Sequence, residues 1–82
     1  MKYNDETSME PRLQEEIQEL LTIITVNFRS QVYDSNPLAR LGGICTAIHA
    51  LTGEIWTPSW DARLRYVLLN EDKTECITPD EL

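Results

Sequence analysis

Residues 36–53 read NPLARLGGICTAIHALTG, and they decide the fold that the sequence predicts. Asn36 is a favoured N-cap residue, because its side chain accepts a hydrogen bond from a backbone N–H left unpaired in the first helical turn. Pro37 then takes the first helical position, where a missing N–H costs nothing. Gly53 suits the left-handed residue that follows a helix end. Leucine and isoleucine recur between these signals every three or four residues, so the pattern predicts a helix over residues 36–52.

One face of this helix carries only small side chains, at Ala39, Gly43, Ala47 and Ala50. Small residues three or four positions apart let a second helix approach closely. A glycine inside a helix costs about 1 kcal/mol relative to alanine, and close packing of a neighbouring helix would offset that cost. We therefore expect this helix at the buried centre of the molecule. The alternative is a kink or break at Gly42 and Gly43.

A long amphipathic helix is predicted before it, over about residues 8–33. Leu20–Phe28 is apolar on nearly every side, because Ile23 and Val26 lie off the main stripe. A helix of this kind is either the centre of a domain or a seam between subunits. The β-branched run at residues 22–26 also fits a strand, but the continuous helical stripe favours a helix. That stripe comprises Leu13, Ile17, Leu20, Ile24, Phe28 and Val32.

A third helix is predicted to begin with Thr57 as N-cap and Pro58 at its first position. Asp61 and Arg65, four residues apart, would pair along one side of it. The predicted fold is all-α, a small bundle of three helices at about residues 8–33, 36–52 and 57–69 with a short polar C-terminal tail. The predicted organisation is a disordered or frayed N-terminus at residues 1–7, a helical domain at residues 8–70 and an acidic C-terminal tail at residues 71–82.

The chain has 82 residues and a formal net charge of −7. Residues 1–19 hold six acids and two bases, and residues 71–82 hold five acids and one base, so each end carries −4 and the middle +1. This balance disfavours direct DNA binding and attraction to an anionic membrane surface. The longest uncharged stretch, Leu41–Gly53, is too short to span a bilayer, and the first residues lack the apolar run of a signal peptide.

The two cysteines form neither a CxxC motif nor a zinc pattern. Cys45 lies in an apolar helix and is expected to be a small buried residue, whereas Cys76 lies in a polar segment and is expected to be accessible. Free thiols are typical of a reducing compartment, so the predicted localisation is cytoplasmic.

Catalytic and metal chemistry finds little support in the sequence. His49 is the single histidine, no partner ligand stands at helical spacing from it, and a structural role is expected. Ser59 and Cys76 are the plausible nucleophiles, but neither lies in a nucleophile elbow. Gly42 and Gly43 lie inside a helix and not in a phosphate-binding loop. The chain is therefore predicted to be no enzyme and to need no metal or cofactor.

One cluster combines aromatic residues with arginine, the composition of interface hot spots and of stacking sites for bases. The competing interpretation is that the tryptophans close the end of a small core while the arginines face solvent. A second set is predicted to pack helices or subunits together. The binding candidates are Trp56, Trp60, Arg63, Arg65 and Tyr66, and the packing candidates are Ala39, Gly43, Ala47, Ile23 and Val26.

The predicted function is that of a small acidic cytoplasmic regulator or inhibitor, which binds another protein and forms a homo-oligomer. Phage-encoded accessory proteins offer an analogy of size and charge only. One alternative is a protein that binds or sequesters an anionic nucleotide or metabolite through Arg40, Arg63, Arg65 and the tryptophans. Another is a nucleic-acid mimic, with acids such as Glu15 and Glu19 along one helix face.

Overall fold

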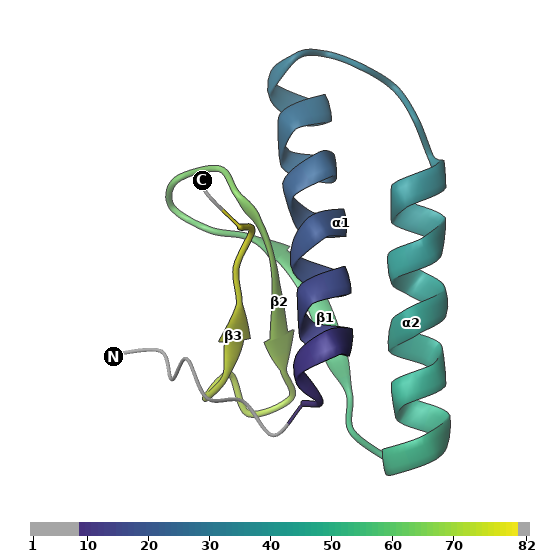
Figure 1. Cartoon of the computed structure of the whole chain (residues 1–82). Coiled ribbons are helices and arrows are strands. Elements are labelled where there is room, and N and C mark those ends of the chain that lie inside the picture. The colour runs from purple at the N-terminus through teal and green to yellow at the C-terminus, as the bar shows by residue number, and fades with distance from the viewer. Residues whose placement is uncertain (1–8, 81–82) are drawn as a thin grey trace.

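The computed structural model describes residues 9–80 and has an α+β architecture: two helices and a three-stranded antiparallel sheet. The predicted all-α bundle of three helices is therefore wrong. The two helices lie side by side, and the sheet packs against the first of them (Figure 1). The elements are α1 (Pro11–Arg29), α2 (Asn36–Thr52), β1 (Trp56–Trp60), β2 (Tyr66–Asn70) and β3 (Cys76–Ile77).

Helix α1 confirms the first predicted helix within narrower bounds than residues 8–33. Glu10 is its N-cap, and the Glu10 carboxylate accepts hydrogen bonds from the backbone N–H groups of Arg12 at 3.1 Å and Leu13 at 3.0 Å. At the other end, Gln31 adopts a left-handed conformation with φ of 57° and ends the helix. The expected frayed segment at residues 1–7 lies outside the described residues.

Helix α1 is also the centre of the fold, since it contacts α2, β2 and β3. Four apolar side chains on one stripe of α1 are buried, as helical periodicity requires. They pack against Leu41 and Ile48 of α2 and against side chains of all three strands. The α1 core residues are Ile17, Leu20, Leu21 and Ile24, and the strands contribute Trp56, Leu68 and Ile77.

Helix α2 confirms the predicted helix at residues 36–52, and Gly53 ends it in the left-handed conformation with φ of 77°. The N-cap is Ser35, so the assignment of this role to Asn36 is wrong by one residue. The helix continues through Gly42 and Gly43, which excludes the predicted alternative of a break.

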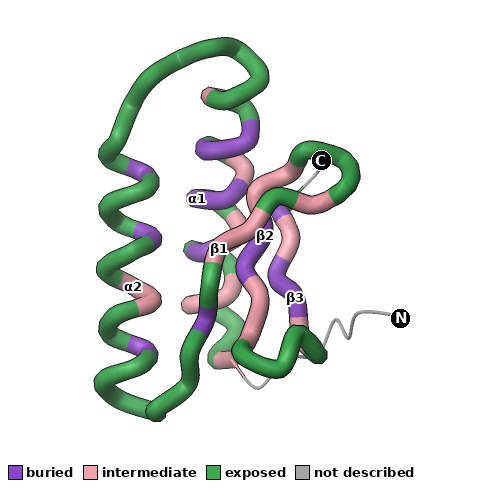
Figure 2. The backbone as a smooth tube through the Cα atoms, turned by 180° about the vertical axis from the view of Figure 1, so that it is seen from behind, coloured by how far each residue is buried: buried purple, intermediate pink, exposed green. Residues whose placement is uncertain are grey.

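The predicted burial of α2 is wrong. This helix contacts only α1 and β1 among the described elements, and most of its surface is exposed (Figure 2). Ala39, Gly43 and Ala47 face solvent, and a Cβ atom built on Gly43 would meet no other atom within 4 Å. The α2 stripe that contains Leu41 and Ile48 faces α1, which leaves the small-residue face without a neighbour.

Residues 57–69 form a β-hairpin and not the predicted third helix. The register pairs Trp56 with Asn70 and Trp60 with Tyr66. Asp61 closes the turn, because its Oδ1 accepts hydrogen bonds from the N–H groups of Arg63 at 2.8 Å and Arg65 at 2.9 Å. These bonds give the backbone a local alternative to a helix.

Pro58 lies on β1, which is an edge of the sheet. The Asp61 N–H donates to the Arg65 carbonyl, and alternation along an antiparallel ladder then directs the backbone groups of Pro58 away from β2. Proline is tolerated there, because its missing N–H removes no bond to a neighbouring strand. The same residue discourages pairing of a further strand to this edge.

Residues 76–80 pack into the domain and do not form the predicted polar tail. Cys76 and Ile77 form β3, and both side chains are buried. The α1 side chains of Gln18 and Thr22 donate to the carbonyl oxygens of Thr78 and Asp80. In this described part of the chain, no helix is long and apolar enough to cross a membrane.

Candidate functional site

An open hollow of about 970 Å³ lies where the end of α1, the α1–α2 linker, the start of α2 and the β1–β2 turn meet. We call it the aromatic groove. Large apolar side chains that are substantially exposed gather in its lining, although the rest of the surface is rich in acids. These side chains are Phe28, Val32, Tyr33, Leu38, Trp60 and Leu64.

Three aromatic rings in contact form one wall of the groove. The ring centroids of Phe28 and Trp60 are 4.5 Å apart, and those of Trp60 and Tyr66 are 4.8 Å apart, with tilted planes. Tilted aromatic pairs at such distances add about 0.5–1.5 kcal/mol each beyond the burial of their surface. Phe28 nevertheless remains 54% exposed, so the wall is ordered by its own contacts and still faces solvent.

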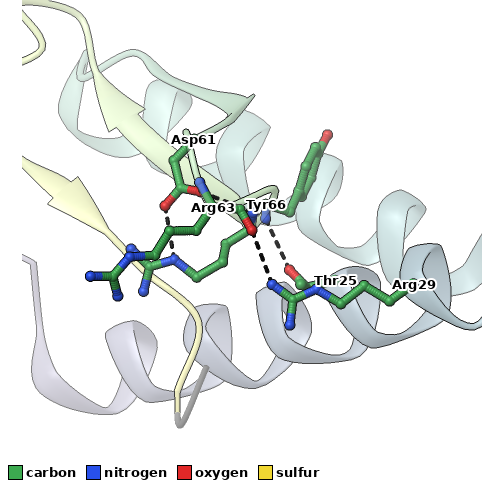
Figure 3. A network of polar contacts seen from close by, with 6 residues as sticks. Thr25, Arg29, Asp61, Arg63 and Tyr66 are labelled. Carbon is green, nitrogen blue, oxygen red and sulfur yellow. Dashed lines mark hydrogen bonds and ion pairs between the residues drawn. The ribbon is translucent and has the colours of Figure 1, made fainter.

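A network of hydrogen bonds fixes the hairpin turn beside this wall (Figure 3). Thr25 and Arg29, one helical turn apart on α1, bind the start of β2 and the turn before it. The Tyr66 N–H donates to Thr25 Oγ1 at 2.9 Å, and Arg29 Nη2 donates to the Arg63 carbonyl at 3.1 Å. Because Thr25 is fully buried, this contact anchors the beginning of β2 to the core.

Asp61 and Arg65 confirm the predicted ion pair, although it lies on a turn and not along a helix. Arg65 Nε and Asp61 Oδ2 are 2.8 Å apart, and both side chains are largely shielded from solvent. Partial burial raises the pKa of Asp61, but hydrogen bonds from Arg65 and Arg63 and the charge of Arg65 outweigh it, so the pKa lies below its ordinary value. The carboxylate therefore stays ionised and keeps the turn closed.

Two residues that line the groove adopt backbone conformations that favour glycine. Gln31 has φ of 57° and Leu64 has φ of 59°. Left-handed backbone costs a residue with a Cβ roughly 1–2 kcal/mol. Leu64 is 57% exposed, so its side chain makes only part of its possible contacts within the chain.

The structure brings together only part of the predicted binding cluster. Trp60 and Tyr66 stack in the groove, and Arg63 and Arg65 lie on the adjoining turn. Trp56 is buried at the far end of β1, where its Nε1 donates to Glu54 at 3.0 Å.

The predicted packing residues are all exposed in the part of the chain that the structure describes. Ile23 and Val26 are each 44% exposed, and they lie on α1 away from the core. The binding candidates predicted from the sequence lack five of the six exposed apolar groove residues: Phe28, Val32, Tyr33, Leu38 and Leu64. A usable signal was present, since a linker that contains adjacent Val32 and Tyr33 is unusually apolar.

The two cysteines and the single histidine lie in different surroundings. Burial raises the pKa of both Cys45 and Cys76, so these thiols are poor nucleophiles at neutral pH. Cys76 is buried, contrary to the expected accessibility, while Cys45 is only half-buried. His49 is exposed on the last turn of α2. Within residues 9–80, no group of three or more His, Cys, Asp or Glu side chains could hold a metal ion.

No protein family, curated protein or solved structure matches this chain.

Proposed function

We propose that this chain is a small acidic cytoplasmic regulator without catalytic activity, which acts by binding another protein in its aromatic groove. The observation that carries the proposal is the gathering of six exposed, large apolar side chains in one hollow. Contiguous apolar patches of several hundred Å² on a small domain mark interaction sites. Aromatic residues beside arginine, here Trp60, Tyr66 and Arg29, are the residue types that dominate binding energy in protein interfaces.

The shape and support of the groove also fit a protein partner. Its aromatic wall is stacked, and its turn is fixed to α1 through Thr25 and Arg29, so little ordering is needed on binding. Preorganised surfaces of this kind lose less conformational freedom when a partner docks. An anionic small ligand is less well supported, because Arg40 pairs with Glu16 at 3.1 Å and Trp56 is buried in the core.

Site-specific photo-crosslinking in the native host tests the proposal. A benzophenone amino acid replaces Leu64 in the groove or, as the control, Leu51, which is 85% exposed on the last turn of α2. At 1.5 Å rise per residue, Leu51 lies about 20 Å along α2 from Leu38. We expect one foreign protein to be crosslinked from position 64 and not from position 51. A position-64 probe that captures no foreign protein would overturn the proposal.

The captured partner then allows a measurement of affinity with purified proteins. Leu64→Asn removes the apolar contact while asparagine tolerates the left-handed backbone, so folding is retained. We expect this variant to weaken partner binding at least about tenfold, as truncation of a central apolar contact does. Leu51→Asn is the matched control and should bind like the unaltered chain. Equal affinities for the two variants would contradict a role for the groove.

A further inference from the structure

We propose that a second copy of this chain also occupies the aromatic groove, in a two-fold dimer in which Tyr33 of each copy inserts into the groove of the other. Tyr33 lies on the α1–α2 linker at the edge of the groove and is 96% exposed. Tyrosine is enriched among the residues that dominate binding energy in interfaces, so a fully exposed tyrosine ring is suited to insertion into a partner. A protruding ring and a hollow that lie on the same face are the two halves of a self-complementary surface.

Self-complementarity matters because a two-fold dimer uses the same patch on both subunits. Each ring would meet the stacked wall of Phe28 and Trp60 in the partner copy. Arg29 and Asp34 both line the groove, so each copy presents one cation and one anion there. In a two-fold dimer, a contact between Arg29 of one copy and Asp34 of the other occurs twice, so this pairing would add two ion pairs. Arg29 retains donors for such a pair, because its guanidinium has five N–H groups.

The distribution of charge favours contact at this end of the molecule. Arg29 and Asp34 are the only charged residues among those described that line the groove, so its lining is neutral although the whole chain carries −7. Glu54, Glu71 and Glu75 gather around the β2–β3 turn, at the end of the molecule opposite the α1–α2 linker (Figure 1). Two copies that meet through their grooves therefore keep these acids apart.

The separation is large enough to remove most of the repulsion. The longest dimension of the fold is 34 Å. Screening by physiological salt acts over a Debye length of about 8 Å, so acids at the two outer ends of a head-to-head dimer interact weakly. Contact through the acidic end, in contrast, would bring like charges together at short range.

The available area is close to what a stable dimer needs. The exposed fractions of the six apolar groove residues together equal between three and four whole side chains. At roughly 200 Å² for a large residue, this is about 700 Å² of exposed surface per copy, backbone and polar atoms included. A standard stable interface buries about 800 Å² per partner. The polar groove residues supply the remaining surface as a rim.

A dimer of this kind covers the surface to which a foreign partner would dock. Self-association would then compete with partner binding, a consequence that rests on the proposed function. The dimer itself does not rest on it, because its evidence is the ring, the hollow and the charges of one chain.

Sedimentation equilibrium of the full chain with a thiol reductant tests the dimer at roughly 5–500 µM, a range that reports micromolar dissociation constants. We expect the average mass to rise from 9.5 kDa toward twice that value as the concentration increases. Tyr33→Ala should raise the dissociation constant at least about tenfold, and Tyr33→Phe should change it little. Leu51→Ala, the control on the last turn of α2, should leave it unchanged.

A chain that remains monomeric throughout this range would overturn the dimer, as would equal effects of Tyr33→Ala and Leu51→Ala. Circular dichroism checks that each variant is folded, which the near-complete exposure of both side chains leads us to expect. The two proposals fail separately. A monomer that still captures a foreign protein from position 64 refutes only the dimer, whereas a dimer that captures none refutes only the proposed function.

Discussion

The hydrogen bond between Thr25 and Tyr66 offers a direct test of how the hairpin is held to α1. Thr25→Val keeps the β-branched shape of the side chain but removes the acceptor at 2.9 Å from the Tyr66 N–H. No atom of the new side chain can replace it, so a partly buried backbone donor loses its partner.

The expected loss of stability follows from two opposing terms. A buried donor without an acceptor costs about 1–3 kcal/mol. The added methyl group returns up to about 0.8 kcal/mol, because Thr25 is fully buried in an apolar surrounding. We therefore expect the free energy of unfolding to fall by about 1–2 kcal/mol. For a domain of this size each kcal/mol shifts the melting temperature by roughly 4–8 °C.

Urea titration followed by tryptophan fluorescence measures this change, since Trp56 is buried in the core. The midpoint should decrease without a change in the slope of free energy against urea, because both forms bury similar surface. Thr22→Val is the matched control on the same helix. The Thr22 hydroxyl donates to the carbonyl oxygens of Gln18 and Asp80 in a more exposed setting, so its loss should cost less than about 0.5 kcal/mol.

A local readout separates the hydrogen bond from general packing. Hydrogen exchange at the Tyr66 amide should become faster in Thr25→Val than in the unaltered chain, relative to the neighbouring amides of β2. The reasoning is refuted if Thr25→Val unfolds within about 0.5 kcal/mol of the unaltered chain, or if Thr22→Val costs as much.

Three further substitutions test other parts of the account. Gly43→Ala should stabilise the chain by about 0.5–1 kcal/mol in thermal unfolding, because the new Cβ meets no atom within 4 Å and alanine favours a helix. Lys73→Gly should stabilise by roughly 0.5–1 kcal/mol, since Lys73 has φ of 60° and its side chain is exposed. Asp61→Asn should lower stability at pH 7 and flatten its acid dependence. The pKa of Asp61 is depressed in the folded chain, so its contribution to stability is fully present above the pKa of the unfolded chain. That contribution is lost as the pH falls through the pKa of the folded chain. Urea midpoints measured from pH 7 to pH 2.5 check this dependence.

The sequence predicted best those features that depend on neighbouring residues. Gly53 marks the end of α2, and the stripe from Ile17 to Ile24 marks the buried face of α1. Asp61 and Arg65 also pair as expected, because residues four apart meet both on a helix and across a tight turn. The pair alone could not distinguish these two structures.

The hairpin was missed because its local signals also fit a helix, while the contacts that hold it to α1 join distant residues. Trp60, Leu64 and Leu68 recur at helical spacing, yet Trp60 and Leu68 also fall on one face of a hairpin once the turn is closed. Asp61 closes the turn locally, but the attachment of the hairpin to α1 depends on Thr25, which lies 41 residues before Tyr66 and accepts a hydrogen bond from the Tyr66 N–H. No pattern among neighbouring residues predicts the hydrogen bond between Thr25 and Tyr66.

That single error also explains the wrong prediction for α2. A third helix was expected to cover the small-residue face, but residues 57–69 form a sheet that packs on α1. No described element covers Gly43. The apolar composition of α2 was read as burial on all sides, although small side chains such as Ala47 lose little when they face water.

Leu64 allows backbone strain to be separated from binding. Its left-handed conformation is costly, whereas glycine adopts it freely. Leu64→Gly should leave stability nearly unchanged, because relief of about 1–2 kcal/mol of strain is offset by the lost partial burial of the side chain and the flexibility of glycine in the unfolded chain. Partner binding should nevertheless weaken about tenfold or more, as for Leu64→Asn. Lys73→Gly relieves the same strain outside the groove and should leave binding intact. If both glycine variants bind the partner normally, the exposed Leu64 side chain does not contribute to binding. The proposal that the groove binds a partner would then lose one of the observations behind it.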